Sequence, residues 1–562
     1  MDLLAYDPPS GYAELYKEQF ASAAEAHFDD AVAKGRIDIE ANAELAAKIR
    51  KVQEAKESTS GKISIYTFLL VLIIVGLIVY AIILGCNVRP ENKVFHWTVF
   101  TVTAVIGCGV IILKLYPALK ALAAREKTLK DELDRLTSAA RKQLAPLYDF
   151  FNWHTLTDLF SKVIPPVVFD EFLSTERLQD LKENFGFALE DEPDSTVTGA
   201  YSGTFYGYPF VFTEDITFAW GEKEWTGSLL ITYRERVTNA EGKSEWVTKT
   251  QLLTASVTKP APEFNYSRNF FFGHDTAPRL TFSRSPSSLS GGEGFWNNLS
   301  KKYQLRKLRK FEQNLTDESQ YTMVANHDFE VLFRTEDRDN EVEFRLLYTP
   351  LAQQYMVKLL NDGESGYGDD FAYIKQGAIT RIVSEHLNNT SLSEPPFHSG
   401  HFDLQEIRKT FLESSAEFFR SIYFSFAPLF LVPVYNEPRL NAPEEETPRT
   451  ISASEIEGAA SFFGAYFAPR ESVTENIFNV STLFYDDNVA HAVIESIGFE
   501  GIPRTDYVPC VGRDCNIHDV PVEWIEYIPV SRHTPIRIWR TEELPPEIEP
   551  LFCRRGFAFV AD

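Results

Sequence analysis

A cysteine and histidine group near the C-terminal end contains residue types that bind zinc. Cys510, Cys515 and His518 lie within nine residues of one another, and Cys553 follows as a further thiol. Thiolate and imidazole are ligands that Zn²⁺ prefers, so this group could form half of a structural site. The spacing differs from that of paired CxxC motifs, which leaves two alternatives open: a labile thiol pair and ordinary loop residues. Zinc is the only cofactor that the sequence suggests.

Two other segments contain metal-ligand residue types. His398, His401 and Asp403 lie in a loop rich in Pro and Gly. The segment Asn361–Asp370 places four acidic side chains among glycines. A calcium loop needs alternating oxygen ligands closed by a bidentate Glu, and this segment does not supply them. We therefore expect a solvated loop at the first segment and an acidic turn at the second.

A basic cluster stands out in a chain that is otherwise acidic. Its members are Lys301, Lys302, Arg306, Lys307, Arg309 and Lys310. Leu305, Leu308 and Phe311 give the same predicted helix a narrow apolar face. Such a helix could lie on anionic headgroups, at about 1 kcal/mol per basic residue near the surface. The alternative is a solvated helix face paired with nearby acids.

Composition and motifs limit the classes of function. The 562 residues include 55 Lys+Arg and 80 Asp+Glu, for a net charge of −25. Nucleic acid is not an expected partner, because phosphate binding needs a basic face. The sequence contains no GxxxxGK[ST] loop, GxGxxG after a strand, GxSxG elbow, HExxH or kinase signature set. The enzymatic alternative is a membrane-tethered, metal-dependent hydrolase that uses the cysteine and histidine residues above.

Two apolar runs predict membrane spans. Residues 63–85 contain no charged side chain, and residues 94–113 contain only His96 as an ionisable group. Each run reaches the ~20 residues that cross a hydrocarbon core of ~30 Å. Lys and Arg are concentrated before the first run and after the second, so the positive-inside rule predicts cytoplasmic flanks and a short outer loop. The expected location is a bacterial inner membrane, with both termini in the cytoplasm.

Residues 114–166 are expected to form a helical stalk and linker. Leucines from Leu115 to Leu136, followed by Ala140, have heptad-like spacing and require a partner helix. The partner could be the helix before the first span or a second copy of the chain. Pro146 and then Pro165–Pro166 end this helical region.

The expected fold class is α+β, with a transmembrane helical hairpin and stalk followed by mixed α+β cytoplasmic domains. The predicted ranges are a helical region at 1–62, the hairpin at 63–113, the stalk at 114–166, an α+β domain at 167–436, a linker at 437–450 and a small α+β module at 451–562. Within them we expect a strand hairpin around residues 239–242, a helix from Pro350, a buried segment at 422–435 and a capping box at Ser452.

We also expect two strands, Glu330–Arg334 and Glu341–Tyr348, joined by the polar turn Asp337–Asn340. The segment that contains them, His327–Leu360, resembles a bacterial family of two-span membrane proteins that contain a domain of unknown function. Members of that family are often encoded near LemA-like proteins. The matching features in the segment are Phe329, Phe333, the polar turn, Glu341–Arg345 and Thr349–Pro350.

Upstream of that segment, Gly199, Gly203 and Phe210–Glu214 are similar to a Gly-rich strand entry and an F-x-F-x-E element of the same family. The resemblance covers about residues 60–360 and implies an architecture but no catalytic residues. The leading hypothesis is therefore a membrane-anchored binding or scaffold protein. Its expected partners are the lipid bilayer and either a protein partner or further copies of the chain.

Overall fold

The computed structural model describes residues 6–87, 93–187, 194–238, 244–291, 295–314, 321–390, 392, 401–440, 450–486 and 489–561. The chain divides into two compact units. Unit 1 comprises Met1–Ala23, Trp153–Pro396 and Ala416–Asp562, and unit 2 comprises Ala24–Asn152 and Phe397–Ser415. The described residues form helices and two antiparallel sheets, which confirms the α+β class.

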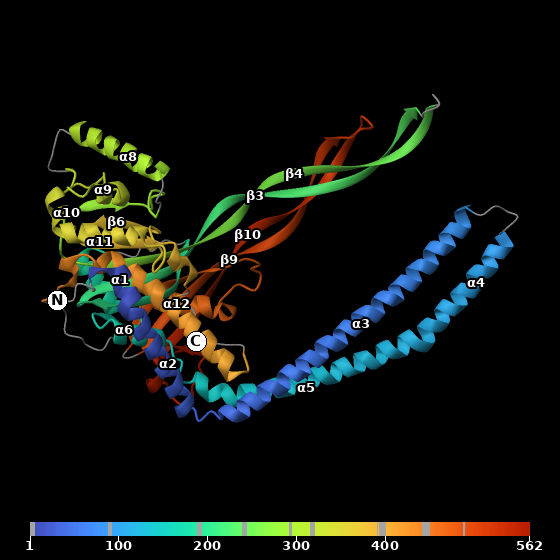
Figure 1. Cartoon of the computed structure of the whole chain (residues 1–562), viewed down its shortest axis with the longest axis horizontal. Coiled ribbons are helices and arrows are strands. Elements are labelled where there is room, and N and C mark those ends of the chain that lie inside the picture. Colours follow the sequence, from blue (N-terminus) through green and yellow to red (C-terminus); the bar gives the residue numbers. More distant parts are fainter. Residues whose placement is uncertain are drawn as a thin grey trace. The chain divides into compact units, whose positions relative to one another are not determined.

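Unit 2 is helical. Its main elements are α3 (Ile39–Asn87), α4 (Lys93–Val110), a π-helical turn η4 (Ile111–Leu115) and α5 (Tyr116–Tyr148), and it also includes parts of α2 (Lys17–Lys34) and α12 (Leu404–Phe430). Helices α3 and α5 pack side by side, with Ala46 and Ile49 of the first and Leu144 and Leu147 of the second buried (Figure 1). Within this chain, the helix that contains the leucine seam packs against the helix that contains the first apolar run.

One stretch of the described residues, Ile39–Gly76, is long and apolar enough to cross a membrane. Its most apolar window is only 6% buried, and Phe68 and Leu72 are 65% and 55% exposed. The predicted second span, residues 94–113, is helical as α4 and η4. The helical region ends with α6 (Thr155–Val163), just before Pro165–Pro166.

A seven-stranded sheet forms the centre of unit 1, in the order β1-β2-β3-β4-β7-β6-β5. Its strands are β1 (Val167–Phe169), β2 (Ser195–Phe205), β3 (Tyr208–Thr238), β4 (Ser244–Gly273), β5 (Thr281–Arg284), β6 (Phe371–Gln376) and β7 (Ile379–Ser384). Strands β2 and β3 are joined through Tyr206 and Gly207, which have φ angles of 50° and 82°. A turn with two positive φ angles matches the twist of a two-stranded ribbon.

One face of this sheet holds the aromatic core. Phe212 stacks on Phe270 with ring centroids 4.2 Å apart, and Phe426 of α12 lies 4.6 Å from Phe270. Offset and edge-on ring contacts of this kind add to the burial of apolar area. The predicted buried segment 422–435 supplies the helical side of this core, with Ile422 and Leu429 fully buried, so that prediction is confirmed.

Two long β-ribbons extend from unit 1. We call residues 219–238 of β3 and 244–261 of β4 the first arm, and residues 500–511 of β9 and 517–529 of β10 the second arm. The arms run side by side (Figure 1) and bury Ile231, Leu253 and Val520 between them. The predicted strand hairpin around residues 239–242 is confirmed by the pairing of β3 with β4, while the turn itself lies outside the described residues.

The C-terminal sheet has five strands in the order β11-β12-β10-β9-β8. These are β8 (Ile477–Asp486), β9 (Val489–Val511), β10 (Ile517–Arg540), β11 (Phe552–Arg554) and β12 (Phe557–Ala561). Helix α13 (Ala453–Phe462) packs on this sheet, and Ser452 caps it by accepting the N–H of Glu455 at 3.2 Å. This confirms the predicted helix start. The Glu455 carboxylate accepts from Leu173 and Arg555.

The predicted strand pair at 330–334 and 341–348 is wrong, because both segments are helical. They form α9 (His327–Phe333) and α10 (Glu341–Leu347). Asn326 and Asn340 cap them by accepting the N–H groups of Phe329 and Glu343. The polar turn therefore ends in a helix cap, and apolar residues three and four positions apart lie on one helical face.

Unit 1 contains further helices and helical turns besides those named above. They are α1 (Pro8–Gly11), η2 (Tyr12–Tyr16), α7 (Thr175–Phe185), α8 (Phe295–Asn314), α11 (Pro350–Asn361), η5 (His386–Asn389), η6 (Pro433–Asn436), η7 (Gly464–Tyr466) and η8 (Thr541–Glu543). Helix α11 begins at Pro350 as predicted, with Thr349 as its N-cap.

Candidate functional site

Helix α8 presents a basic surface, and the exposed side chains of Leu299 and Tyr303 lie on the same side of the helix. Lys302, Arg306, Lys307, Arg309 and Lys310 are all exposed, and Lys301 is half-buried. Leu299 and Tyr303 are 50% and 69% exposed. Leu299, Tyr303, Arg306 and Lys310 follow at intervals of four, three and four, so they share one face of the helix. We call these four residues and Lys302 the basic face.

The apolar stripe predicted from the sequence lies on another side of α8. Leu308 is 3% exposed, and the ring of Phe311 lies 5.4 Å from that of Tyr321. These side chains therefore attach α8 to its own unit. The sequence identified the basic residues, but it missed Leu299 and Tyr303, whose spacing relative to Arg306 was the available signal.

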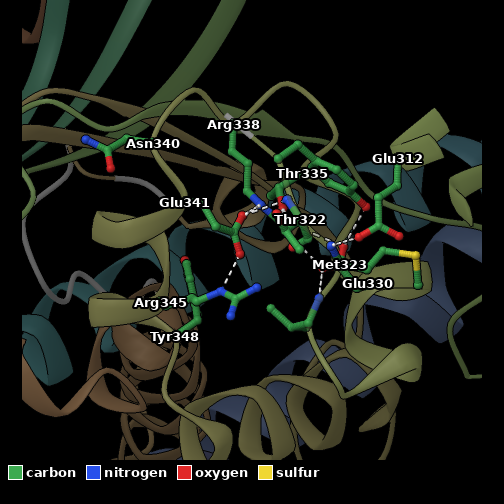
Figure 2. A network of polar contacts seen from close by, with 12 residues as sticks. Glu312, Thr322, Met323, Glu330, Thr335, Arg338, Asn340, Glu341, Arg345 and Tyr348 are labelled. Carbon is green, nitrogen blue, oxygen red and sulfur yellow. Dashed lines mark hydrogen bonds and ion pairs between the residues drawn. The ribbon is translucent and has the colours of Figure 1, made fainter. Parts of the chain in front are cut away.

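Beside α8, a buried network of hydrogen bonds and ion pairs joins residues between Tyr321 and Glu341 (Figure 2). Arg338 is fully buried, and its Nη2 lies 2.9 Å from Oε1 of Glu330 while its Nε lies 2.8 Å from Oε2 of Glu341. The rings of Tyr321 and Phe344 each lie 4.2 Å from the guanidinium. Two carboxylates and two aromatic faces therefore surround one cation, which compensates for its loss of water.

The network reaches α8 through the backbone. Oε1 of Glu312, on α8, accepts the N–H of Met323 at 2.9 Å, and Oε1 of Glu330 accepts the N–H of Val324 at 2.8 Å (Figure 2). Tyr321 donates its hydroxyl to Glu330 at 3.1 Å, and burial together with the Glu330 charge raises the pKa of this phenol. Glu312 thus joins α8 to the backbone at Met323, and Glu330, which neutralises Arg338, holds the next residue of that backbone.

The same network keeps Arg338 charged. Burial alone would lower the pKa of Arg338, but the bonds to Glu330 and Glu341 outweigh it and raise that pKa. None of these residues was identified as a functional candidate from the sequence, because acids and arginines eight residues apart are common on exposed surfaces. They serve to position α8.

The cysteine and histidine group lies on the second arm. Cys510 and His518 are opposite each other in the β9–β10 register, and Nε2 of His518 lies 3.0 Å from Oδ2 of Asp514. Cys510 packs against the apolar cluster between the arms, and Cys515 is exposed in the turn with a φ of 62°. Cys553 is opposite Ala558 on β12, at the other end of β10. Within the described ranges, no three His, Cys, Asp or Glu side chains converge as metal ligands.

The other predicted segments are tied into the fold. Asp403 pairs with Arg50 of α3, and His398 lies outside the described residues. In the acidic segment, Asp362 accepts backbone N–H groups of Ser365 and Gly366 at 3.0 and 2.9 Å. The Asp362 contacts are those of an acidic turn, whereas Asp369 of the same segment is buried and pairs with Arg284.

The arms expose large apolar side chains on the outer surfaces of both ribbons. On the first arm these include Leu230, Trp246 and Leu252, at 65%, 69% and 60% exposure. On the second arm Val511 and Ile517 are each 70% exposed. Exposed apolar residues grouped on a projecting element are typical of interaction surfaces.

Comparison with protein families, with curated proteins and with solved structures finds no match for this chain. The family resemblance of residues 60–360 therefore stays a prediction.

Proposed function

We propose that this protein is a membrane-anchored binding protein of the bacterial inner membrane, with both termini in the cytoplasm. The observation that carries this proposal is the exposed apolar part of α3. A helix that is apolar on all sides and unburied is unfavourable in water and favourable in hydrocarbon. In this proposal residues 63–85 and 94–113 cross the membrane as a hairpin, and the packed α3–α5 pair continues into the cytoplasm as the stalk.

The basic face of α8 supports a second contact with the bilayer. Its cations belong to a chain with a net charge of −25, so an anionic surface would attract this face and repel most of the remaining surface. Leu299 and Tyr303 supply apolar area at the same place, as interfacial helices do.

The exposed apolar residues of the arms support association with a protein. Leu230, Leu252 and Trp246 give the first arm a surface for a partner or for a second copy of the chain. In this proposal the arms bind proteins while the anchor keeps them near the membrane.

The anchor is tested by expressing the full chain and extracting membranes with alkaline carbonate. We expect the native protein to stay in the membrane pellet. A double variant, Leu72→Arg with Val75→Arg, should be released, because each charge at mid-membrane costs about 2.5–3.5 kcal/mol for insertion. The matched control, Leu72→Ala with Val75→Ala, should stay in the pellet. Complete release of the native protein would contradict the proposal.

Association is tested by native mass measurement of the detergent-extracted protein after mild cross-linking. We expect a species heavier than one chain, and its yield should fall in Leu230→Glu with Leu252→Glu. A single-chain mass in several detergents, with no cross-linked neighbour, would contradict the binding function and leave the anchor unaffected.

A further inference from the structure

A cleft of about 870 Å³ lies within unit 1, on the face of the seven-stranded sheet opposite the aromatic core. Its floor consists of alternate residues of five strands, and its other wall consists of the first turn of α13 and the edge strand β8 with Glu495 of β9. Lining residues with hydroxyl or amide groups include Ser195, Thr217, Ser267, Gln376, Ser454 and Asn479. This volume is within the range of small-molecule sites in proteins.

Asn269 connects a carboxylate and a guanidinium on the floor of the cleft. Its Nδ2 donates to Oδ2 of Asp215 at 3.0 Å, and its Oδ1 accepts from Nε and Nη2 of Arg381 at 3.0 and 2.8 Å. Thr213 also donates to Oδ2 of Asp215, at 2.7 Å. Asn269 is 5% exposed, so a buried amide fixes the two charged groups beside each other.

Asp215 and Arg381 each have a polar side-chain atom that is left to bind a ligand. In the described part of the chain, no hydrogen bond involves Oδ1 of Asp215 or Nη1 of Arg381. The guanidinium also lies 5.8 Å from the ring of Phe271, which faces the cleft. The floor therefore offers an acceptor with negative charge and a donor with positive charge, both held in place before a ligand arrives.

The distance between these groups suits a small zwitterion. Two hydrogen bonds and the width of one amide, ~2.3 Å, separate Oδ2 of Asp215 from Nη2 of Arg381, so these two atoms, which Asn269 bonds, lie within about 8 Å of each other. The free atoms Oδ1 and Nη1 belong to the same two groups. The ammonium and carboxylate of an α-amino acid are separated by one carbon atom. With a hydrogen bond at each end, such a molecule spans a gap of this size.

We propose that this cleft binds a free α-amino acid, with its carboxylate on Arg381 and its ammonium group on Asp215. The opposite wall favours a basic side chain, because Glu457 and Glu495 line it and, among the described lining residues, Arg381 is the only cation. The cleft lies wholly within unit 1, so this inference does not depend on the membrane anchor.

Titration calorimetry on the full chain in detergent micelles tests the proposal. The probes are L-arginine, L-lysine and L-glutamate, with Nα-acetyl-L-arginine and L-argininamide as matched ligands that each lack one charged group of the zwitterion. We expect L-arginine and L-lysine to bind more tightly than L-glutamate. Each blocked derivative should bind at least about tenfold more weakly than L-arginine, since each loses one charge-assisted hydrogen bond.

Variants then locate the site. Arg381→Gln and Asp215→Asn should each weaken L-arginine binding about tenfold or more. Arg279→Gln, at an exposed arginine that does not line the cleft, should leave it unchanged. Absence of binding by all three amino acids, or equal binding of the blocked derivatives, overturns the proposal. The derivatives are measured on the native protein, so this result stands even where a variant fails to fold. Equal binding to Arg381→Gln with retained folding also overturns it.

Discussion

Arg338 and Glu330 form an ion pair in which both side chains are almost completely removed from water, with 2.9 Å between Nη2 and Oε1. The pair connects α9, which contains Glu330, to the loop before α10, which contains Arg338. A buried pair contributes little net stability compared with apolar residues, but removing one partner leaves an uncompensated charge. The segment around α8 therefore depends on both members of the pair.

The first prediction concerns this pair. Glu330→Gln should destabilise the α8–α10 segment by about 3–5 kcal/mol, because it leaves Arg338 with one carboxylate fewer in a buried site. Amide hydrogen exchange of peptides from residues 321–348 measures the loss of protection. Glu336→Gln, at a partly exposed acid nearby, is the matched control and should leave exchange unchanged. Equal exchange in native protein and Glu330→Gln would show that the pair is dispensable.

The second prediction concerns the contact between the arms. A Cβ added to Gly227 would lie 2.0 Å from the carbonyl oxygen of Pro521, so Gly227→Ala should push the arms apart and cost about 1–3 kcal/mol. Faster amide exchange in residues 250–257 and 517–523 would report this separation. Gly363→Ala, where no atom lies within 4 Å, is the control. Unchanged exchange would mean that the ribbons do not pack as described.

The third prediction concerns lipid binding by α8. In nanodiscs with about one third anionic lipid, α8 of the full chain should exchange its amides more slowly than in zwitterionic nanodiscs. The variant Lys302→Gln, Arg306→Gln and Lys310→Gln should lose this difference, because each basic residue near an anionic surface contributes about 1 kcal/mol.

The control for this lipid experiment replaces exposed cations elsewhere, with Arg504→Gln and Arg532→Gln, and should behave as the native protein. Protection of α8 that is the same in both lipids would contradict an electrostatic contact. Protection in anionic lipid that survives the triple variant would assign the contact to Leu299 and Tyr303 alone.

The fourth prediction concerns pH. Burial lowers the pKa of His274 to about 3, and its Nδ1 accepts the N–H of Thr276 at 3.0 Å. Asp275, Lys375 and Arg439 are the charged neighbours, and only Asp275 favours protonation. Between pH 6.5 and 3 the unfolded chain protonates this histidine and the folded chain does not, so stability falls as the pH decreases through this range.

From pH 6.5 to pH 5 the loss due to His274 should be about 2 kcal/mol. The melting temperature of the native protein should therefore decrease over this range, and that of His274→Asn should decrease less. His533→Asn, at an exposed histidine, should follow the native protein. A parallel decrease in His274→Asn would exclude His274 as the cause.

Patterns that depend on neighbouring residues were predictable from the sequence. The cap at Ser452, the helix from Pro350, the basic helix and the buried segment at 422–435 follow from local chemistry and apolar spacing. The wrong prediction of strands at α9 and α10 also came from local residue patterns. Asn326 and Asn340 precede acidic first turns, which is a helix signal, but the β-rich residues between them suggested strands.

Features that depend on distant residues were not predictable in this way. The cleft brings Asp215, Arg381 and Glu457 together from three separate elements, and each of them alone resembles an ordinary surface charge. The fully buried state of Arg338 likewise follows from tertiary packing with Tyr321 and Phe344. Sequence spacing contains no information on either arrangement.

The contact between Gly227 and Pro521 also sets an order of events during synthesis. At 5–20 residues per second, the ribosome needs about 15 to 60 s to pass from the first of these residues to the second. Throughout that interval the inner side of the first arm, with Ile231 and Leu253, has no second arm to cover it. A newly made chain therefore exposes the apolar inner side of the first arm after its N-terminal helices have already been synthesised. Chaperone binding to the nascent chain should be strongest in that window and should end when residues 517–523 have left the ribosome.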